Sequence, residues 1–313
     1  MKKWNYVFDC PDQKKVRMIV YTDCKNEADD QFALAHHLMT PKFIIKGIIG
    51  GHFNMAAGYR NLEGKSADAS VQEIEKVLSL MGCSGDYIVK KGAEYPLEDE
   101  FTPRDSDGAR LIIEEAMKDD PHPLFIACQG SITDLASAII LEPRICERMT
   151  AIWIGGGEYP EGGEEFNQDQ DIAAANVVFK SNMPLWQVPK NVYKQVSVTL
   201  AELQANVYPC GEIGKYLVEQ MVEFNNACAN IPTWPNGEMW GLGDSPTIGL
   251  LLEEVEKTDI YDMVPAPEID YDTHKYIHKK NNRKIRVYNE VNARLILGDM
   301  FAKLKINFGN DNL

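Results

Sequence analysis

Short apolar segments alternate with segments of helical periodicity over the first half of the chain. The apolar runs cover residues 16–21, 43–49, 87–89, 124–127 and 151–154. The helical patterns cover residues 29–39, 71–81, 109–117, 133–141 and 171–179. Repeated strand and helix signals in this order are typical of a parallel sheet with helices on its faces. The sequence therefore predicts an α/β fold, with a mostly parallel central sheet flanked by helices as in Rossmann-like proteins.

The pattern becomes mostly helical toward the C-terminus, over residues 200–205, 213–228, 247–255 and 291–304. Two short apolar segments, residues 276–278 and 285–288, flank a basic stretch and predict a hairpin with an exposed turn. Because composition does not change abruptly along the chain, we expect a single domain over residues 1–313, with residues 1–15 as an N-terminal extension.

The formal net charge of −15 argues against nucleic acid and anionic membrane surfaces as partners, because both are polyanions. No apolar run reaches the length of about 18 residues that a membrane span needs. The seven cysteines are scattered along the chain, which is typical of reduced thiols in the cytoplasm. We therefore expect a cytoplasmic protein that acts on a neutral or cationic small molecule.

Four acidic residues, Asp23, Glu27, Asp29 and Asp30, follow the first apolar run and lead into the first helical pattern. One acid at such a position would be explained as a helix cap, and Asp29 or Asp30 fits that role. Four acids repel one another unless a cation lies between them. Carboxylate and carbonyl oxygens suit Ca²⁺, whereas zinc prefers His or Cys. The junction thus predicts a calcium site at the carboxyl edge of the sheet, where open α/β folds bind ligands.

Small and polar residues also follow three other predicted strands, at residues 51–54, 129–131 and 155–157. A polar loop at residues 164–167 and Asp244, just before a predicted helix, offer further oxygen and nitrogen ligands. Asp244 alone would be read as a helix cap. Agreement among four strand ends indicates one ligand site at this edge.

Cysteine, histidine and tryptophan side chains supply the remaining candidates. Cys24 has anionic neighbours that suppress its thiolate, so we do not expect it to be a nucleophile. His52 follows a strand end beside Asn54 and could face the site as a titrating group. Three tryptophans could stack on an aromatic ligand or fill the core, namely Trp186, Trp234 and Trp240.

The order of these motifs resembles the inosine-uridine nucleoside hydrolase family over about residues 17–301. The matching elements are Thr22-Asp23 with Asp29-Asp30, residues 50–54, 92–97 and 130–136, Glu165-Phe166-Asn167 with Asp171, Ala174 and Ala175, and Asp244. The resemblance implies a nucleoside hydrolase-like fold, a homodimer or homotetramer, and calcium-dependent hydrolysis of the N-glycosidic bond of a nucleoside or related riboside.

The resemblance also implies a role for each matching residue. Asp23, Asp30, Asp244 and the backbone carbonyl of Gln129 would hold Ca²⁺. The ribose hydroxyls would be bound by Asp29, Asn54, Glu165 and Asn167. His52 is a further candidate for substrate contact because of its place after a strand end, and not because of the resemblance. Asp23 would also accept the proton of the attacking water. These roles agree with the chemistry, because anionic groups stabilise the oxocarbenium-like transition state and a metal activates water.

Two features depart from the common family pattern. The interval between Asp23 and Asp29 is longer and resembles a divergent N-E-x-D-D branch, in which Glu27 could reach the metal or the sugar. Gly243 stands where many members carry the histidine that protonates the leaving base. Two other readings of the acid cluster remain open: a metal-dependent phosphohydrolase, which would need Lys or Arg toward the phosphate, and a non-catalytic riboside-binding protein.

Overall fold

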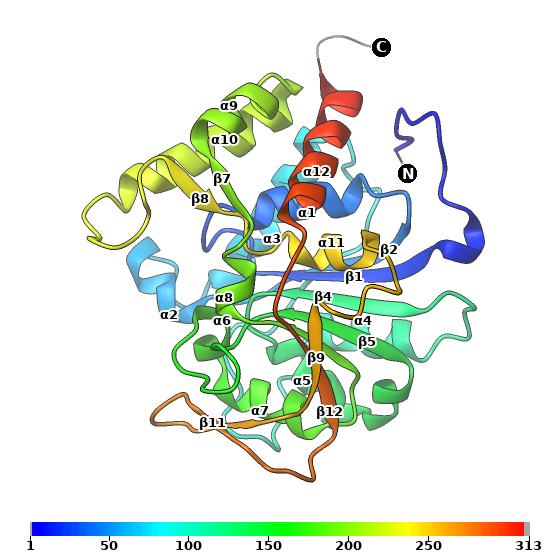
Figure 1. Ribbon diagram of the computed structural model, residues 1–313, viewed down its shortest axis with the longest axis vertical. Coiled ribbons are helices and arrows are strands. Elements are labelled where there is room, and N and C mark those ends of the chain that lie inside the picture. Colours follow the sequence, from blue (N-terminus) through cyan, green and yellow to red (C-terminus); the bar gives the residue numbers. More distant parts are fainter. Residues whose placement is uncertain (1, 310–313) are drawn as a thin grey trace.

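An eight-stranded sheet forms the centre of the molecule (Figure 1). The computed structural model describes residues 2–309. The strands, in spatial order, are β3 (Val89–Lys91), β2 (Phe43–Gly50), β1 (Val16–Thr22), β4 (Leu124–Gln129), β5 (Met149–Ile154), β6 (Leu185–Val188), β12 (Lys284–Tyr288) and β9 (Tyr261–Pro265). Neighbouring strands pair in parallel except for β9, which runs antiparallel to β12 at one edge. The predicted mostly parallel sheet is confirmed.

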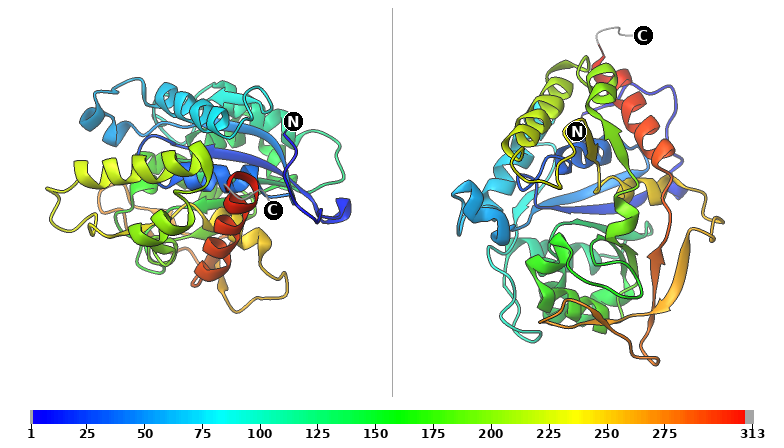
Figure 2. Two further views of the ribbon diagram at one scale, coloured as in Figure 1. Left: turned by 90° about the horizontal axis from the view of Figure 1, so that it is seen from above. Right: turned by 60° about the vertical axis from the view of Figure 1, so that its left-hand side comes forward.

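Helices cover both faces of this sheet (Figures 1 and 2). One layer contains α1 (Asp30–Leu38), α3 (Ser66–Leu80), α9 (Leu200–Asn206), α10 (Gly211–Ala227), α11 (Pro246–Leu252) and α12 (Ala293–Phe308). The other contains α4 (Asp107–Ala116), α5 (Thr133–Leu141) and α7 (Ile172–Lys180). Short connecting elements are α2 (Asn54–Ala57), α6 (Phe166–Gln170), α8 (Lys190–Tyr193), η1 (Asp12–Lys14), η2 (Gly58–Arg60) and η3 (Pro143–Glu147). Two small sheets pair β7 (Ser197–Thr199) with β8 (Met239–Gly241), and β10 (Glu268–Ile269) with β11 (Tyr276–Ile277).

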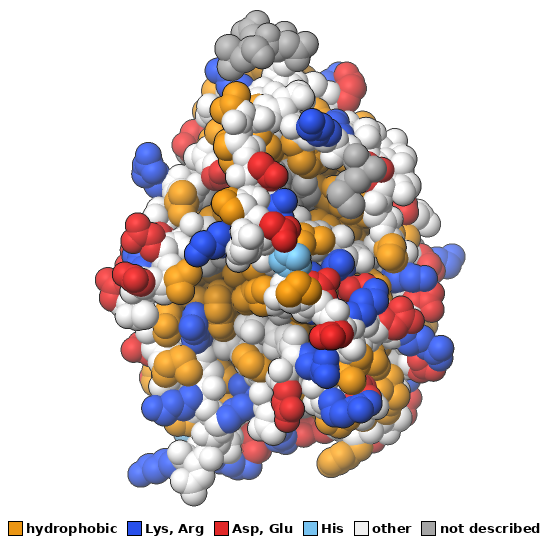
Figure 3. Space-filling view, turned by 90° about the vertical axis from the view of Figure 1, so that its right-hand side faces the viewer, with side chains coloured by type: hydrophobic (Ala, Val, Ile, Leu, Met, Phe, Trp, Pro, Cys, Tyr) orange, Lys and Arg blue, Asp and Glu red, His pale blue; other side chains and the backbone are white. Residues whose placement is uncertain are grey.

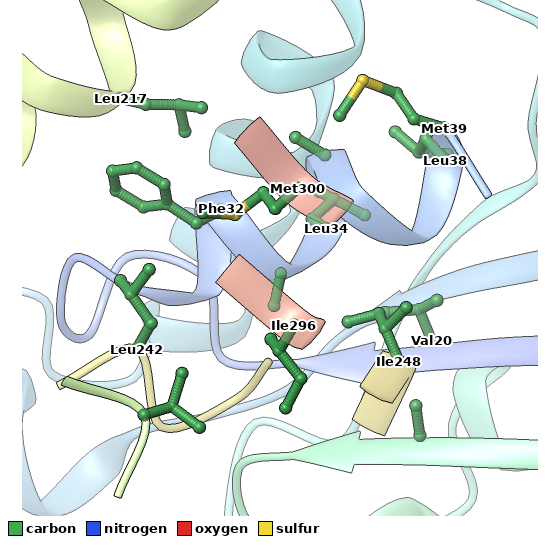
Figure 4. Close-up of a cluster of buried hydrophobic side chains, with 14 of the residues drawn as sticks. Val20, Phe32, Leu34, Leu38, Met39, Leu217, Leu242, Ile248, Ile296 and Met300 are labelled. Carbon is green, nitrogen blue, oxygen red and sulfur yellow. The ribbon is translucent and has the colours of Figure 1, made fainter. Parts of the chain in front are cut away.

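Both faces of β1 are buried, which explains why the strand reads as a continuous apolar run. Met18 and Val20 pack into the core beneath α1, whereas Ile19 and Tyr21 pack into the core on the opposite face. Figure 4 shows part of the first core, where side chains from α1, α11 and α12 meet above β1; they include Phe32, Leu34, Ile248, Ile296 and Met300.

The strand order reverses direction beside β1. The chain leaves β1 for β2 and β3 on one side, then returns to β4 on the other side and continues through β5 to β6. Thr22, the last residue of β1, pairs with Gly50 of β2 and with Gln129 of β4. Three strands therefore end side by side at the topological switch point, where open α/β sheets bind ligands.

The predicted hairpin between residues 276–278 and 285–288 is wrong. β12 instead enters the main sheet between β6 and β9, and β11 pairs with β10. Ile285 and Val287 are 1% and 5% exposed, so this strand gains more burial inside the large sheet than a two-stranded hairpin would give it. Two adjacent apolar segments indicate strands, but they do not determine which strands pair.

Residues before β1 lie against the helical layer. The Lys2 ammonium donates to the Met81 carbonyl over 2.5 Å, and the Trp4 ring contacts the Phe308 ring edge-on at 5.9 Å between centroids. On the face shown in Figure 3, charged side chains of both signs are interspersed with hydrophobic ones. Within residues 2–309, no helix has the length and apolar character that a membrane span requires.

Candidate active site

A pocket opens at the carboxyl ends of β1, β4 and β5. Its lining comes from six separate segments of the chain and consists of Asp23, Asn26, Glu27, Asp29, Asp30, Gln129, Ile154, Glu165, Phe166, Asn167, Tyr193, Gly243 and Asp244. Six of these residues carry carboxyl groups. So high a density of acids in a buried pocket is costly unless they are protonated or face a cation.

The turn between β1 and α1 supplies most of the acids. Asp23 directly follows β1, Asp29 stands at the N-cap of α1, and Asp30 is the first helical residue. The Asp29 side chain makes no capping hydrogen bond, so capping does not explain it. The Thr22 hydroxyl donates to the Asp30 carboxylate and directs it back toward the strand end. The acids of this turn thus line the pocket and do not serve as caps of the helix that follows.

Asp244 joins this turn from a distant part of the chain. One carboxylate oxygen each from Asp29, Asp30 and Asp244 lie within 4.8 Å of one another. Burial, together with the charge of Asp29, raises the pKa of Asp30 to about 8. Burial also raises the pKa of Asp23 and Asp244, in both cases reinforced by the charge of Asp30. The buried Oδ2 of Asp23 has no hydrogen-bond partner within the described chain. This oxygen-rich cluster therefore fits a hard cation.

A polar layer beneath the cluster fixes Asp244. The Gln129 amide donates to the Thr247 hydroxyl over 2.8 Å and to the Asp244 carbonyl over 3.3 Å, and Thr247 donates to that carbonyl over 2.7 Å. His37 Nε2 lies 3.1 Å from the same hydroxyl. Burial lowers the pKa of His37 well below its usual value, so the imidazole is neutral here. His37 thus belongs to the polar layer that supports Asp244.

The opposite wall carries groups able to bind hydroxyls. Glu165 is the N-cap of α6, and its Oε2 accepts from the backbone N–H groups of Gly156 and Gln168 over 2.8 and 2.9 Å. Gly156 has a φ of 90°, a conformation that favours glycine. The Asn167 amide donates to the Ile154 carbonyl over 2.9 Å. These contacts hold the polar side chains of the loop after β5 against the pocket.

Two predicted site residues lie outside the pocket lining. The Asn54 amide donates to the Glu94 carbonyl, and His52 Nε2 lies 2.8 Å from the Thr133 hydroxyl. Burial lowers the pKa of His52 to about 4. Trp240 packs against Phe224 and Trp234 in the helical layer, and Trp186 lies under Arg286. The backbone of His52 and Asn54 thus lies after β2, at the carboxyl edge of the sheet, as expected. Their side chains bind Thr133 and Glu94 and do not line the pocket.

Several lining residues were given no role from the sequence, namely Asn26, Ile154, Phe166 and Tyr193. Tyr193 follows β6 at the same edge of the sheet. Extending the strand-end rule to β6 indicates this segment, although Tyr193 itself lies beyond the residues that directly follow the strand. Glu27 does line the pocket, and burial with the charge of Asp29 raises its pKa to about 8.

Solved structures of similar fold cover nearly the whole chain. A purine-preferring ribonucleoside hydrolase from Gardnerella vaginalis superposes with a TM-score of 0.71 at 18% identity, over 92% of this chain and 98% of that chain. An inosine-guanosine nucleoside hydrolase superposes with a TM-score of 0.68 at 16% identity, over 93% and 99% of the two chains. At these identities the likeness concerns the fold.

Sequence relatives point the same way. The chain is 35% identical to an inosine-uridine preferring nucleoside hydrolase of Crithidia fasciculata over 98 residues, 30% of each chain. It is 22% identical to the pyrimidine-specific ribonucleoside hydrolase RihA of Salmonella arizonae over 268 residues, 75% of this chain and 79% of that one. The match thus spans under a third of the Crithidia protein and about four fifths of the Salmonella protein.

The family model described as inosine-uridine preferring nucleoside hydrolase matches residues 18–306, from within β1 to within α12. That range includes every residue of the pocket lining. The chain belongs to the inosine-uridine preferring nucleoside hydrolase family.

Proposed function

We propose that this member of the family hydrolyses the N-glycosidic bond of a nucleoside or related riboside, using a Ca²⁺ ion and releasing free ribose and free base. The observation that carries the proposal is the pocket at the switch point, in which six carboxyl groups face one small volume. An anionic pocket of this kind suits a reaction whose transition state places positive charge on the sugar ring.

The residues present fit a hard divalent cation. Asp23, Asp30, Asp244 and the backbone carbonyl of Gln129 would hold it. The unpartnered buried Oδ2 of Asp23 supports the first of these, and the close approach of the Asp30 and Asp244 carboxylates supports the next two, although Asp29 is the third carboxylate of that close group. These donors are all oxygens, which favours Ca²⁺ over zinc. When bound, such a cation lowers the pKa of water and so supplies a nucleophile near neutral pH.

The remaining side chains have roles of their own. Asp29 and Glu165 would accept hydrogen bonds from the ribose hydroxyls, the Asn167 amide would accept from or donate to them, and Asp23 would accept the proton of the attacking water. The resemblance adds Asn54, and its place after a strand end adds His52, but their engagement with Glu94 and Thr133 leads us to omit both from the proposed set.

Phosphate ester hydrolysis fits the pocket less well. The described lining contains acids, amides, a tyrosine and apolar groups, and none of its residues is Lys or Arg. Phosphoryl transfer needs cationic groups that stabilise the charge of the transferring phosphate. Carboxylates in their place would repel the substrate.

Location and assembly are proposed alongside the activity. Seven free cysteines, five of them buried, support a cytoplasmic location, where thiols stay reduced. A homodimer or homotetramer is proposed from the family resemblance. Light scattering on the purified chain tests the assembly, and cell fractionation tests the location.

The decisive experiment is a reducing-sugar assay over purine and pyrimidine ribosides with Ca²⁺, run beside a panel of phosphate esters. Release of ribose and base from at least one riboside is expected. Asp23→Asn should abolish it, whereas Asp99→Asn, in an exposed loop, should not. Phosphate release without ribose would establish the phosphohydrolase reading. Tight nucleoside binding without cleavage at any pH would establish the binding-protein reading.

A further inference from the structure

Tyr193 connects two parts of the pocket that come from distant segments. Its hydroxyl donates to Glu165 Oε1 over 2.9 Å. Its ring lies against Gly243, where a Cβ atom would stand 3.0 Å from Tyr193 Cδ2. One side chain thus contacts both the loop after β5 and the segment that carries Asp244.

Tyr193 completes the fixation of Glu165. Backbone N–H groups of Gly156 and Gln168 hold Oε2, and the tyrosine hydroxyl holds Oε1. A carboxylate bound at both oxygens cannot rotate about its terminal torsion without breaking a hydrogen bond. Glu165 is 1% exposed, so water does not replace a lost partner easily. The tyrosine therefore fixes the second oxygen of a carboxylate whose first oxygen is held by backbone N–H groups.

The tyrosine and the loop that carries Glu165 are fastened together. Tyr193 ends α8, whose first residue, Lys190, donates its backbone N–H to the Gly156 carbonyl over 3.0 Å. The Lys190 ammonium donates to the Glu164 carbonyl over 3.0 Å. These contacts keep the Tyr193 hydroxyl within hydrogen-bond distance of the Glu165 carboxylate.

The ring also explains the glycine at position 243. The φ of Gly243 is outside the left-handed range, so backbone conformation does not demand glycine there. A Cβ atom would instead meet the tyrosine ring at 3.0 and 3.6 Å and Asp29 Oδ2 at 3.5 Å. Residue 193 and any side chain at 243 compete for the same space.

Tyr193 acts as a neutral hydrogen-bond donor. Burial and the charge of Glu165 raise the pKa of the phenol far above its usual value. The phenol therefore keeps its proton, which suits a group that orients a carboxylate.

We propose that Tyr193 is a positioning residue of the riboside site, which holds Glu165 toward the sugar and fills the space beside Gly243. This inference rests on the proposed function. It means that a residue on α8 orients the sugar-binding carboxylate. It also means that the effects of changes at Tyr193 and Gly243 depend on each other.

Tyr193→Phe tests the hydroxyl while keeping the ring. We expect the KM for a cleaved riboside and the Kd for D-ribose in Ca²⁺ to rise about tenfold, because Glu165 would lose a hydrogen bond to its charged group and with it part of its orientation toward the sugar. The value of kcat and the bound Ca²⁺ should change less than about twofold. Tyr216→Phe is the matched control, because the Tyr216 hydroxyl donates to Glu73, outside the pocket lining.

A second pair of variants separates positioning from a general structural role. In Glu165→Ala, the added change Tyr193→Phe should alter the ribose Kd less than about twofold, because no carboxylate remains to be oriented. As a single change, Gly243→Ala should weaken ribose binding. Added to Tyr193→Ala, in which the competing ring is absent, it should weaken ribose binding no further. Effects that multiply in the two double variants would overturn the inference.

Failure of this inference differs from failure of the proposed function. If the parent protein cleaves a riboside and Tyr193→Phe leaves KM and ribose Kd unchanged, the positioning role is wrong and the function stands. If the parent binds and cleaves no riboside, the function is wrong. In that case, crystal structures of the parent and of Tyr193→Phe decide the inference, since an unmoved Glu165 carboxylate would contradict it.

Discussion

Thr22 and Gln129 are paired in register at the ends of β1 and β4, and this pairing brings Asp23 beside the first residue after β4. A Cβ atom on that residue, Gly130, would lie 3.0 Å from the Asp23 carboxyl carbon. The glycine thus leaves room for a buried acid at the switch point. The acid cluster is a product of the sheet's register as much as of the local turn.

Metal retention is the first prediction. Purified protein should carry about one Ca²⁺ per chain, because the donors are carboxylate and carbonyl oxygens. Asp30→Asn should bind Ca²⁺ at least about 100-fold more weakly. Even substitutions of residues that only hydrogen-bond to metal ligands typically lower metal affinity about 10–100-fold. Elemental analysis and calorimetric titration measure both quantities. Zinc alone, or full activity after complete removal of metal, would contradict the calcium assignment.

Thermal stability should respond to the same ion. A ligand present at 100 times its Kd stabilises the folded chain by about 2.7 kcal/mol. Chelation should therefore lower Tm by several degrees, and added Ca²⁺ should restore it. Asp30→Asn should show no such response. Asp120→Asn should respond like the parent, because Asp120 lies at the amino ends of the strands, where it pairs with Arg17 near the start of β1.

The metal-free protein should become less stable as pH rises. Burial raises the pKa of Asp30 and of Glu27 to about 8, from ordinary values of 3.8 and 4.5. Between those limits the folded chain binds more protons than the unfolded chain, so the free energy of unfolding falls with rising pH. A bound cation favours the ionised acids, so Ca²⁺ should flatten or reverse the trend.

Tm measured from about pH 5 to about pH 9, in chelator and in excess Ca²⁺, checks this coupling. Asp30→Asn should reduce the slope in chelator, because it removes one of the titrating acids. A Tm that rises steadily with pH in chelator would show that these acids are ionised in the metal-free fold.

The sequence predicts some parts of the site and not others, for physical reasons. The positions of Asp23, Asp29 and Asp30 could be predicted because these acids follow a fully buried strand. The direction of the chain then places them at the carboxyl end of that strand. His52 and Asn54 share that edge, but side-chain direction depends on neighbours such as Thr133 and Glu94. Backbone position therefore located them without orienting them.

Long-range pairing was the other limit. β12 pairs with β6, which is far away in sequence, and with β9, whereas the sequence pattern predicts pairing with the adjacent apolar segment at residues 276–278. Tyr193 was assigned no role from the sequence, because the strand-end argument covered only four strands and β6 was not one of them. Only the fold shows that its hydroxyl reaches Glu165.

Asp29 and Asp30 should differ in function although they are adjacent. We expect Asp29→Asn to raise the ribose Kd and the riboside KM about tenfold with little change in bound Ca²⁺, because its proposed partner is a sugar hydroxyl. Asp30→Asn should lose the ion. Their carboxylates and that of Asp244 lie within 4.8 Å, so equal loss of Ca²⁺ in both variants would make Asp29 a metal ligand instead.

Two glycines test the packing of the helical layer that supports Asp244. A Cβ at Gly249 on α11 would lie 2.3 Å from Ile296 Cγ1 on α12, and Ile296 is 1% exposed. Gly249→Ala should therefore destabilise the protein by about 1–3 kcal/mol through overpacking. Gly298→Ala, on α12 with open space around it, should stabilise it by about 0.5–1 kcal/mol, because alanine favours helix. Urea unfolding of both variants measures the difference.

A double variant serves as the control. Adding Ile296→Ala to Gly249→Ala should lower the free energy of unfolding by less than the sum of the two single effects, because the smaller side chain removes the clash. Equal stability of Gly249→Ala and the parent would show that α11 and α12 are not in close contact at this point.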